Sequence, residues 1–103
     1  MLNEPDLLQG VRSWAAEKAP DFGSAGVVLT VTEWPEGTGA VQLELDADTR
    51  IAEIMVWADG NAEITFVDVT AGEITPEHRD LRSEADLLDA LSVMNTWTGA
   101  AAS

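Results

Sequence analysis

The sequence predicts an α+β fold in which an N-terminal and a C-terminal helix flank a four- or five-stranded antiparallel meander sheet. Three observations carry this prediction: helical spacing of apolar residues near both ends of the chain, strand-like segments between them, and short turns joining those segments. Each helical segment has a single apolar stripe, so both helices are expected to cover the same face of the sheet. The 103 residues are expected to form one domain over residues 1–99, followed by a loose tail at 100–103.

The first helix is expected to begin around residues 3–6, where Asn3 can cap it and the acidic residues suit the positive end of the helix dipole. Its apolar face follows helical spacing through Leu7, Leu8, Val11, Trp14 and Ala15. Pro20 is expected to end the helix, because the residue before a proline avoids the α region. Residues 21–26 are then expected to form a loop.

Strands are expected at residues 27–34, 41–46, 52–57 and 62–69, with a short fifth strand at 73–80. Residues 41–46 alternate strictly between apolar and polar, which is typical of a strand with one buried face. Pro76 restricts the fifth strand to an edge of the sheet. If Trp34 shares the parity of Thr30 and Thr32, it lies on the exposed face with them.

The turn between the third and fourth strands sets their register. A two-residue Asp59-Gly60 loop would mix apolar and polar residues on both faces of the sheet. A three-residue loop with a left-handed Gly60 instead pairs Val56 with Ala62, and places all the apolar residues of the hairpin on one face. We therefore expect the three-residue loop and this core face: Ala52, Ile54, Val56, Ala62, Ile64 and Phe66.

The second helix is expected to start at Ser83, because residues 83–86 resemble a capping box with Asp86 in place of the usual Glu or Gln. It is expected to fray near Thr98 and Gly99. Its predicted apolar face comprises Leu87, Leu88, Leu91 and Met94.

The composition excludes several classes of function. Five basic and 19 acidic residues give a net charge of −14, which opposes binding to nucleic acids and to anionic membranes. The absence of cysteine removes disulfides, thiol catalysis and cysteine-based zinc sites. The sequence has neither a signal-peptide pattern nor an apolar run of about 20 residues, so we expect a cytoplasmic protein.

No catalytic motif is evident, and we expect neither enzymatic activity nor a cofactor. The single histidine, His78, lies among polar residues and is expected to be exposed, and a surface histidine without a role is favoured over a general base. Asp46, Asp48 and Glu53 flank one turn, but their spacing matches no calcium loop, so a solvated acidic rim is favoured over a metal site.

The exposed face of the predicted sheet is the candidate binding surface. Parity places large apolar side chains there among acidic ones, and tryptophan is the residue type most enriched at binding hot spots. Acidic neighbours would steer a basic partner. The residues expected to contact it are Trp57, Met55, Glu53, Glu63, Glu44, Asp46 and Trp34. The alternative for Trp57 is packing under the C-terminal tail or against Trp97.

A resemblance adds to this interpretation. The segment from Glu53 to Ile64, with Trp57 before the turn and Gly60 within it, resembles the strand–Trp–turn–Gly–strand signature of the TriTu family of immunity proteins. So do the segment from Val67 to Glu73, the Glu77-His78 pair and the leucines of the last helix. The resemblance implies a bacterial antidote that binds an ADP-ribosyltransferase toxin, one that modifies elongation factor Tu, and blocks its active site.

The competing class is a small acidic secretion chaperone, which would dimerise and hold an unfolded segment of an effector. An immunity protein would instead bind a folded toxin domain. The residues leave the oligomeric state open, with a monomer favoured, and they leave the identity of the toxin open.

Overall fold

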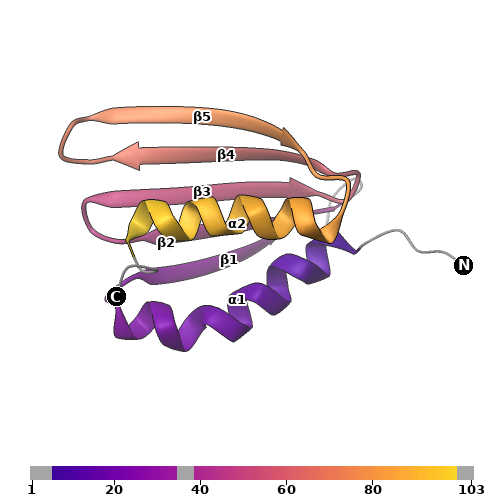
Figure 1. The fold of residues 1–103 in the computed structure, drawn as a ribbon, viewed down its shortest axis with the longest axis horizontal. Coiled ribbons are helices and arrows are strands. Elements are labelled where there is room, and N and C mark those ends of the chain that lie inside the picture. The colour runs from indigo at the N-terminus through magenta and orange to yellow at the C-terminus, as the bar shows by residue number, and fades with distance from the viewer. Residues whose placement is uncertain (1–5, 35–38, 100–103) are drawn as a thin grey trace, which may run out of the picture.

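The computed structural model describes residues 6–34 and 39–99, and it confirms the predicted α+β architecture with five strands. Helix α1 precedes an antiparallel sheet whose strand order follows the chain, and helix α2 completes the fold (Figure 1). The elements are α1 (Leu7–Ser24), β1 (Val28–Trp34), β2 (Ala40–Asp46), β3 (Arg50–Trp57), β4 (Asn61–Asp68), β5 (Glu73–Asp80) and α2 (Glu84–Thr98). The expected Asn3 cap and the expected tail at 100–103 lie outside the described residues.

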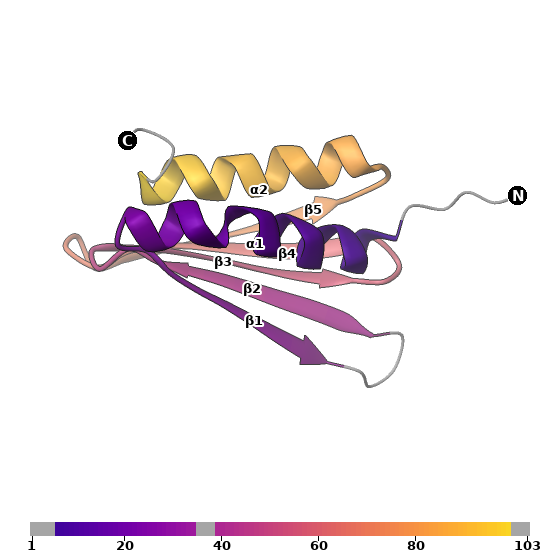
Figure 2. The ribbon, with the colours of Figure 1, turned by 90° about the horizontal axis from the view of Figure 1, so that it is seen from below.

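Both helices lie on one face of the sheet, as the single apolar stripes predict (Figure 2). Helix α1 lies over β1, β2 and β3, whereas α2 lies mainly over β3 and has further side-chain contacts with β4 and β5. The core fills the layer between helices and sheet, and all six predicted core-face residues of the β3–β4 hairpin are buried in it. Burial of apolar area in this layer is the main force that holds the two layers together.

The β3–β4 hairpin has the predicted register, with Val56 opposite Ala62 and Ile54 opposite Ile64. Gly60 adopts a φ of +97°, a conformation that side chains disfavour. A Cβ atom at this position would also lie 2.5 Å from the carbonyl oxygen of Leu81. Gly60 is therefore required both by the turn and by the close approach of the chain after β5.

Helix α1 differs from the prediction at both ends. Asp6 caps it by accepting a hydrogen bond from the Gln9 N–H at 3.0 Å, so the cap lies three residues after Asn3. Pro20 does not end the helix, which continues to Ser24. The extra turn buries Phe22, whose ring lies 5.6 Å from that of Trp14. This apolar contact offsets the hydrogen bond that the proline removes.

Helix α2 begins as predicted. The Ser83 hydroxyl accepts a hydrogen bond from the Asp86 N–H at 3.2 Å, and the Asp86 carboxylate accepts one from the Arg82 N–H at 2.9 Å. The reciprocal bond of the predicted capping box thus goes to the residue before the cap. Gly99 ends the helix in the left-handed conformation, with a φ of +82°.

One predicted core position in α2 is wrong. Leu88 is 53% exposed, and Ala90 is buried in its place. The buried residues are Leu87, Ala90, Leu91 and Met94, which follow the spacing i, i+3, i+4, i+7. Leu88 is one residue away from this stripe and so points out of the interface.

Candidate functional site

The face of the sheet that points away from both helices is the candidate site, and we call it the open face (Figure 2). Side chains alternate along a strand, and paired residues of an antiparallel sheet share a face, so the register assigns every strand position. The open face comprises Val28, Thr30, Thr32 and Trp34 of β1; Ala40, Gln42, Glu44 and Asp46 of β2; Ile51, Glu53, Met55 and Trp57 of β3; Asn61, Glu63, Thr65 and Val67 of β4; and Ile74, Pro76, His78 and Asp80 of β5.

The structure brings all seven predicted contact residues onto this face. They come from four neighbouring strands, which hold them in a fixed array because the strands are paired along their whole length. The set is Trp34, Glu44, Asp46, Glu53, Met55, Trp57 and Glu63. Met55 occupies the middle of the array, between Gln42 on β2 and Glu63 on β4.

Two tryptophans mark one end of the open face. Ala40 is paired with Trp34 on one side and with Trp57 on the other. Although Ala40 belongs to the open face, it is only 5% exposed at its position between the two tryptophans. Trp34 itself is 44% exposed, and its indole N–H donates a hydrogen bond to the Gln42 side-chain oxygen at 3.1 Å. This hydrogen bond fixes the indole at the surface.

Trp57 does not pack against Trp97, which was one of the two alternatives for it; the other, packing under the C-terminal tail, concerns residues 100–103, which lie outside the described residues. Trp97 belongs to α2 and lies on the helix side of the sheet, where its ring is 5.5 Å from that of Phe66. The guanidinium of Arg50 lies 4.7 Å from the centre of the Trp97 ring, and the Trp97 indole N–H donates to the Ile51 carbonyl. Trp57 is half-buried on the opposite face.

Two carboxylates face each other at the centre of the open face. Glu44 of β2 is directly opposite Glu53 of β3. Like charges in this position are destabilising. The Gln42 side-chain amide donates a hydrogen bond to the Glu53 carboxylate, which offsets part of the repulsion. The two carboxylates are close enough together to bind one positively charged group of another molecule.

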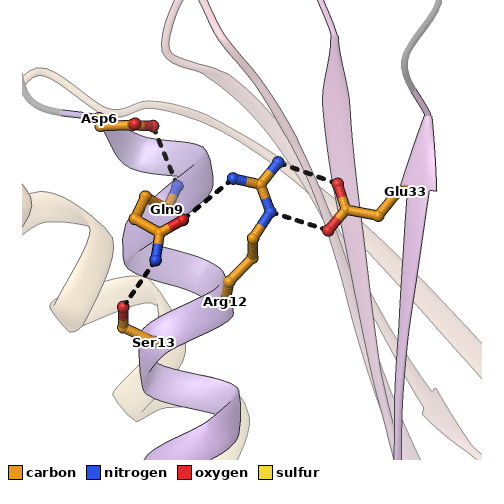
Figure 3. Close-up of polar contacts among 5 residues, drawn as sticks. All are labelled: Asp6, Gln9, Arg12, Ser13 and Glu33. Carbon is orange, nitrogen blue, oxygen red and sulfur yellow. Dashed lines mark hydrogen bonds and ion pairs between the residues drawn. The ribbon is translucent and has the colours of Figure 1, made fainter.

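The basic residues lie elsewhere. No strand position of the open face is Lys or Arg, although the chain has five such residues and all lie within the described segments. On the helix side, Arg12 binds Glu33 through two bonds of 2.8 and 2.9 Å (Figure 3), and Arg79 binds Asp89 at 3.1 Å. Arg50 packs against α2. The strand positions of the open face are therefore acidic without any Lys or Arg, whereas on the helix side arginines pair with some of the acidic residues.

His78 is exposed, as predicted, but it has acidic partners that the sequence did not reveal. Its Nδ1 lies 2.7 Å from the Glu63 carboxylate, and its Nε2 lies 3.3 Å from the Asp80 carboxylate. The hydrogen bond to Glu63 is the main cause of a raised His78 pKa, and the bond to Asp80 adds to it. These two carboxylates therefore stabilise the protonated form of the His78 imidazole.

The described residues give no support for a metal centre. Among residues 6–34 and 39–99, no three His, Asp or Glu side chains are grouped so that they could hold an ion. Asp46, one of the acidic residues of the rim, instead accepts a hydrogen bond from the Asp48 N–H at 3.0 Å and so stabilises the β2–β3 turn. Over the same ranges, no helix has the length and apolar character needed to span a membrane.

Comparison with known families decides what kind of protein this is. The model of the immunity protein TriTu matches residues 9–97, which include the whole sheet and all but the outer ends of the two helices. The chain belongs to the TriTu family of immunity proteins. Comparisons with curated proteins and with solved structures give no match. A member of the TriTu family is an immunity protein, so the partner implied for this chain is a toxin.

Sequence reasoning placed the large and acidic side chains of this TriTu protein correctly but missed the polar contacts between them. Gln42, which bonds to Trp34 and to Glu53, was not singled out. The pairing of His78 with Glu63 was also missed. Both contacts follow from the registers of β2 with its neighbours and of β4 with β5, so a complete assignment of register would have revealed them.

Proposed function

We propose that this immunity protein neutralises its cognate toxin by docking the open face over the active site of the toxin, without catalysis of its own. By its family resemblance, the proposed toxin is an ADP-ribosyltransferase that modifies elongation factor Tu. The proposed partner surface is basic, and the proposed compartment is the bacterial cytoplasm, where such a toxin would act.

One observation carries the proposal: the open face combines two surface indoles with directly opposed carboxylates, and it has no Lys or Arg. Repulsion between Glu44 and Glu53 lowers the stability of the free protein. A basic partner would turn that repulsion into attraction. The indoles would supply the apolar contact area that dominates most interfaces.

The residues are proposed to have two different roles. Trp57, Met55 and Trp34 would be buried against the toxin and would slow dissociation. The four acidic residues would act over a longer range and accelerate association with a basic surface. These acidic residues are Glu44, Asp46, Glu53 and Glu63.

The apolar role is tested by replacing Trp57 with alanine. We expect Trp57→Ala to weaken toxin binding by about 2 kcal/mol or more, which is roughly a 30-fold increase in Kd. The matched control is Leu88→Ala, which truncates an exposed apolar side chain on α2, away from the open face. Binding and thermal melting are measured for both. If Trp57→Ala binds as tightly as Leu88→Ala, the toxin docks elsewhere.

The acidic role is tested by two double charge reversals. Glu44→Lys with Glu63→Lys alters the open face, whereas Glu17→Lys with Asp21→Lys alters exposed acidic residues of α1. Each pair changes the net charge from −14 to −10. We expect only the open-face pair to slow association strongly, and we expect wild-type association to slow as salt is raised. Equal effects from both pairs would show that overall charge, not the open face, attracts the toxin.

The blocking mechanism is tested with a candidate toxin domain, which is to be sought among the genes adjacent to this one. Transfer of ADP-ribose to purified elongation factor Tu is followed while the immunity protein is added. We expect activity to fall linearly to zero at one equivalent. Binding without inhibition would refute active-site blocking. Binding only to an unfolded toxin would instead support the secretion-chaperone alternative.

A further inference from the structure

The two edge strands of the sheet differ in how well they are protected against pairing with a further strand. Strand β1 forms one edge and β5 forms the other. In an edge strand, alternate residues direct both the backbone N–H and the C=O outward, where another strand can bond to them. The register therefore determines which residues present a free backbone at each edge.

At the β1 edge, the outward-facing residues follow from the β2–β3 ladder. The Ala47 N–H bonds to the Arg50 carbonyl at 2.9 Å, and the Ala58 N–H bonds to the Gly39 carbonyl at 3.1 Å. These bonds show that odd-numbered residues of β2 face β3, so its even-numbered residues face β1. Their partners in β1 are also even-numbered. The backbone groups that point outward are consequently those of Leu29, Val31 and Glu33.

At the β5 edge, the same reasoning gives a different result. The Leu81 N–H bonds to the Gly60 carbonyl at 2.7 Å, which continues a ladder in which odd-numbered residues of β5 face β4. The outward-facing positions include Pro76, which has no N–H, and both His78 and Asp80, which carry polar or charged side chains. A proline and charges at an edge prevent another strand from pairing there.

The β1 edge has no such protection. Four of its seven residues are β-branched, and Val28 is 64% exposed. Its only charged residue, Glu33, is neutralised by Arg12 (Figure 3). Within residues 6–34 and 39–99, no backbone group from outside the sheet bonds to the outward-facing groups of β1. The edge is thus neutral, exposed and suited to strand pairing.

We propose that the β1 edge pairs with an extended segment at the surface of the folded toxin domain, a segment of neutral or basic composition. This inference rests on the proposed function. The pairing would extend the sheet beside Thr30, Thr32 and Trp34, which already belong to the open face. The added strand and the open face would then form one continuous binding surface.

Charge distinguishes this occupant from a second copy of the chain. Pairing of two β1 edges would bring together two molecules that each carry a charge of −14. That repulsion opposes self-association. The same negative charge attracts a basic segment of another protein and does not repel a neutral one. The acidic residues of the open face, which begin on the neighbouring strand β2, favour the same choice.

Amide hydrogen exchange measured by NMR tests the pairing at single residues. In the free protein, we expect the amides of Leu29, Val31 and Glu33 to exchange rapidly, and those of Thr30 and Thr32 to be protected by their bonds to β2. In the complex with the candidate toxin domain, we expect the first three amides to exchange at least ten-fold more slowly. The alternating pattern is specific to strand pairing, because general shielding would slow neighbouring amides alike.

A pair of variants tests whether the backbone itself is used. Val31→Pro removes one outward N–H without breaking a bond to β2, whereas Val31→Thr keeps the N–H and a similar shape. We expect Val31→Thr to bind the toxin domain at least ten-fold more tightly than Val31→Pro, while melting temperatures show that both remain folded. Equal affinities of the two folded variants would overturn the pairing.

The outcomes separate this inference from the proposed function. A complex that is weakened by Trp57→Ala, yet leaves the three β1 amides in rapid exchange, overturns the edge pairing and leaves the open-face function intact. Failure of the toxin domain to bind at all overturns both. Protection of the same amides in the free protein, increasing with its concentration, assigns the edge to a second copy and overturns the choice of toxin.

Discussion

Replacement of Glu44 with glutamine should make this protein more stable and at the same time a poorer partner for its toxin. Glu44 and Glu53 are directly opposite, at a position where the two strands do not bond to each other through these residues. In such a pair the side chains are at their closest. Neutralising one of them removes a repulsion but leaves the size and shape of the side chain unchanged.

The size of the stabilisation can be bracketed. Two unit charges about 6 Å apart repel by roughly 0.7 kcal/mol in bulk water and by about 3 kcal/mol at an effective dielectric constant near 20. Measured effects of cross-strand pairs are about 0.2–1 kcal/mol, and both residues here are half-buried. We therefore expect Glu44→Gln to gain about 0.5–1 kcal/mol. For a domain of this size, that gain raises Tm by about 2–8 °C.

The assay is thermal and denaturant unfolding of Glu44→Gln, Glu53→Gln and the double variant. Either single change relieves the same repulsion, so the second change should add less than the first. The gain should shrink in about 1 M salt, because the Debye length falls to roughly 3 Å. Additive gains, a gain that salt leaves unchanged, or a loss of stability would each refute the reasoning. Glu44→Gln should also slow association with the toxin.

Three further predictions concern folding. Ile54→Ala should destabilise the protein by about 2–5 kcal/mol in denaturant unfolding, because Ile54 is fully buried; a loss below about 1 kcal/mol would contradict its place in the core. The raised pKa of His78 means that its bond to Glu63 adds stability below the unfolded pKa near 6.5, and that this stability is lost as pH rises through the folded pKa. The Tm difference between the wild type and His78→Gln should therefore be larger at pH 5.5 than at pH 9, and a constant difference would refute the ion pair. Pro20→Ala should stabilise α1 by about 2 kcal/mol, since it restores a backbone N–H and relieves a ring clash; unchanged unfolding would show that α1 is already distorted there.

The fold could be predicted from the sequence wherever the pattern of apolar and polar residues was compatible with only one register of the strands. The β3–β4 hairpin is the clearest case, because a register shifted by one residue would have exposed Ile54 and Ile64. The same parity argument placed Trp57 and Met55 on the opposite face. For these strands, the need to bury apolar side chains determined both the core and the candidate site.

The remaining features depended on contacts that local patterns do not contain. Pro20 predicts the end of a helix, but the burial of Phe22 in the core stabilises a further turn after the proline. Leu88 is apolar and helical, yet the position of α2 over the sheet makes Ala90 the buried residue. Gln42 gained its importance only from Trp34 and Glu53, which are distant in the chain. Such contacts require the assembled sheet before they can be recognised.

The alternation of side chains along the strands has a consequence for how such an antidote can change. In β3, every second residue stabilises the core, and the residues between them form the open face. Substitutions at surface positions away from special features usually alter stability by less than about 0.5 kcal/mol. Much of the open face can therefore be rewritten to follow an altered toxin while Ile54 and Val56 keep the same sheet folded. Apart from coupled pairs such as Glu44 and Glu53, stability and specificity are encoded in the same strands but can vary almost separately.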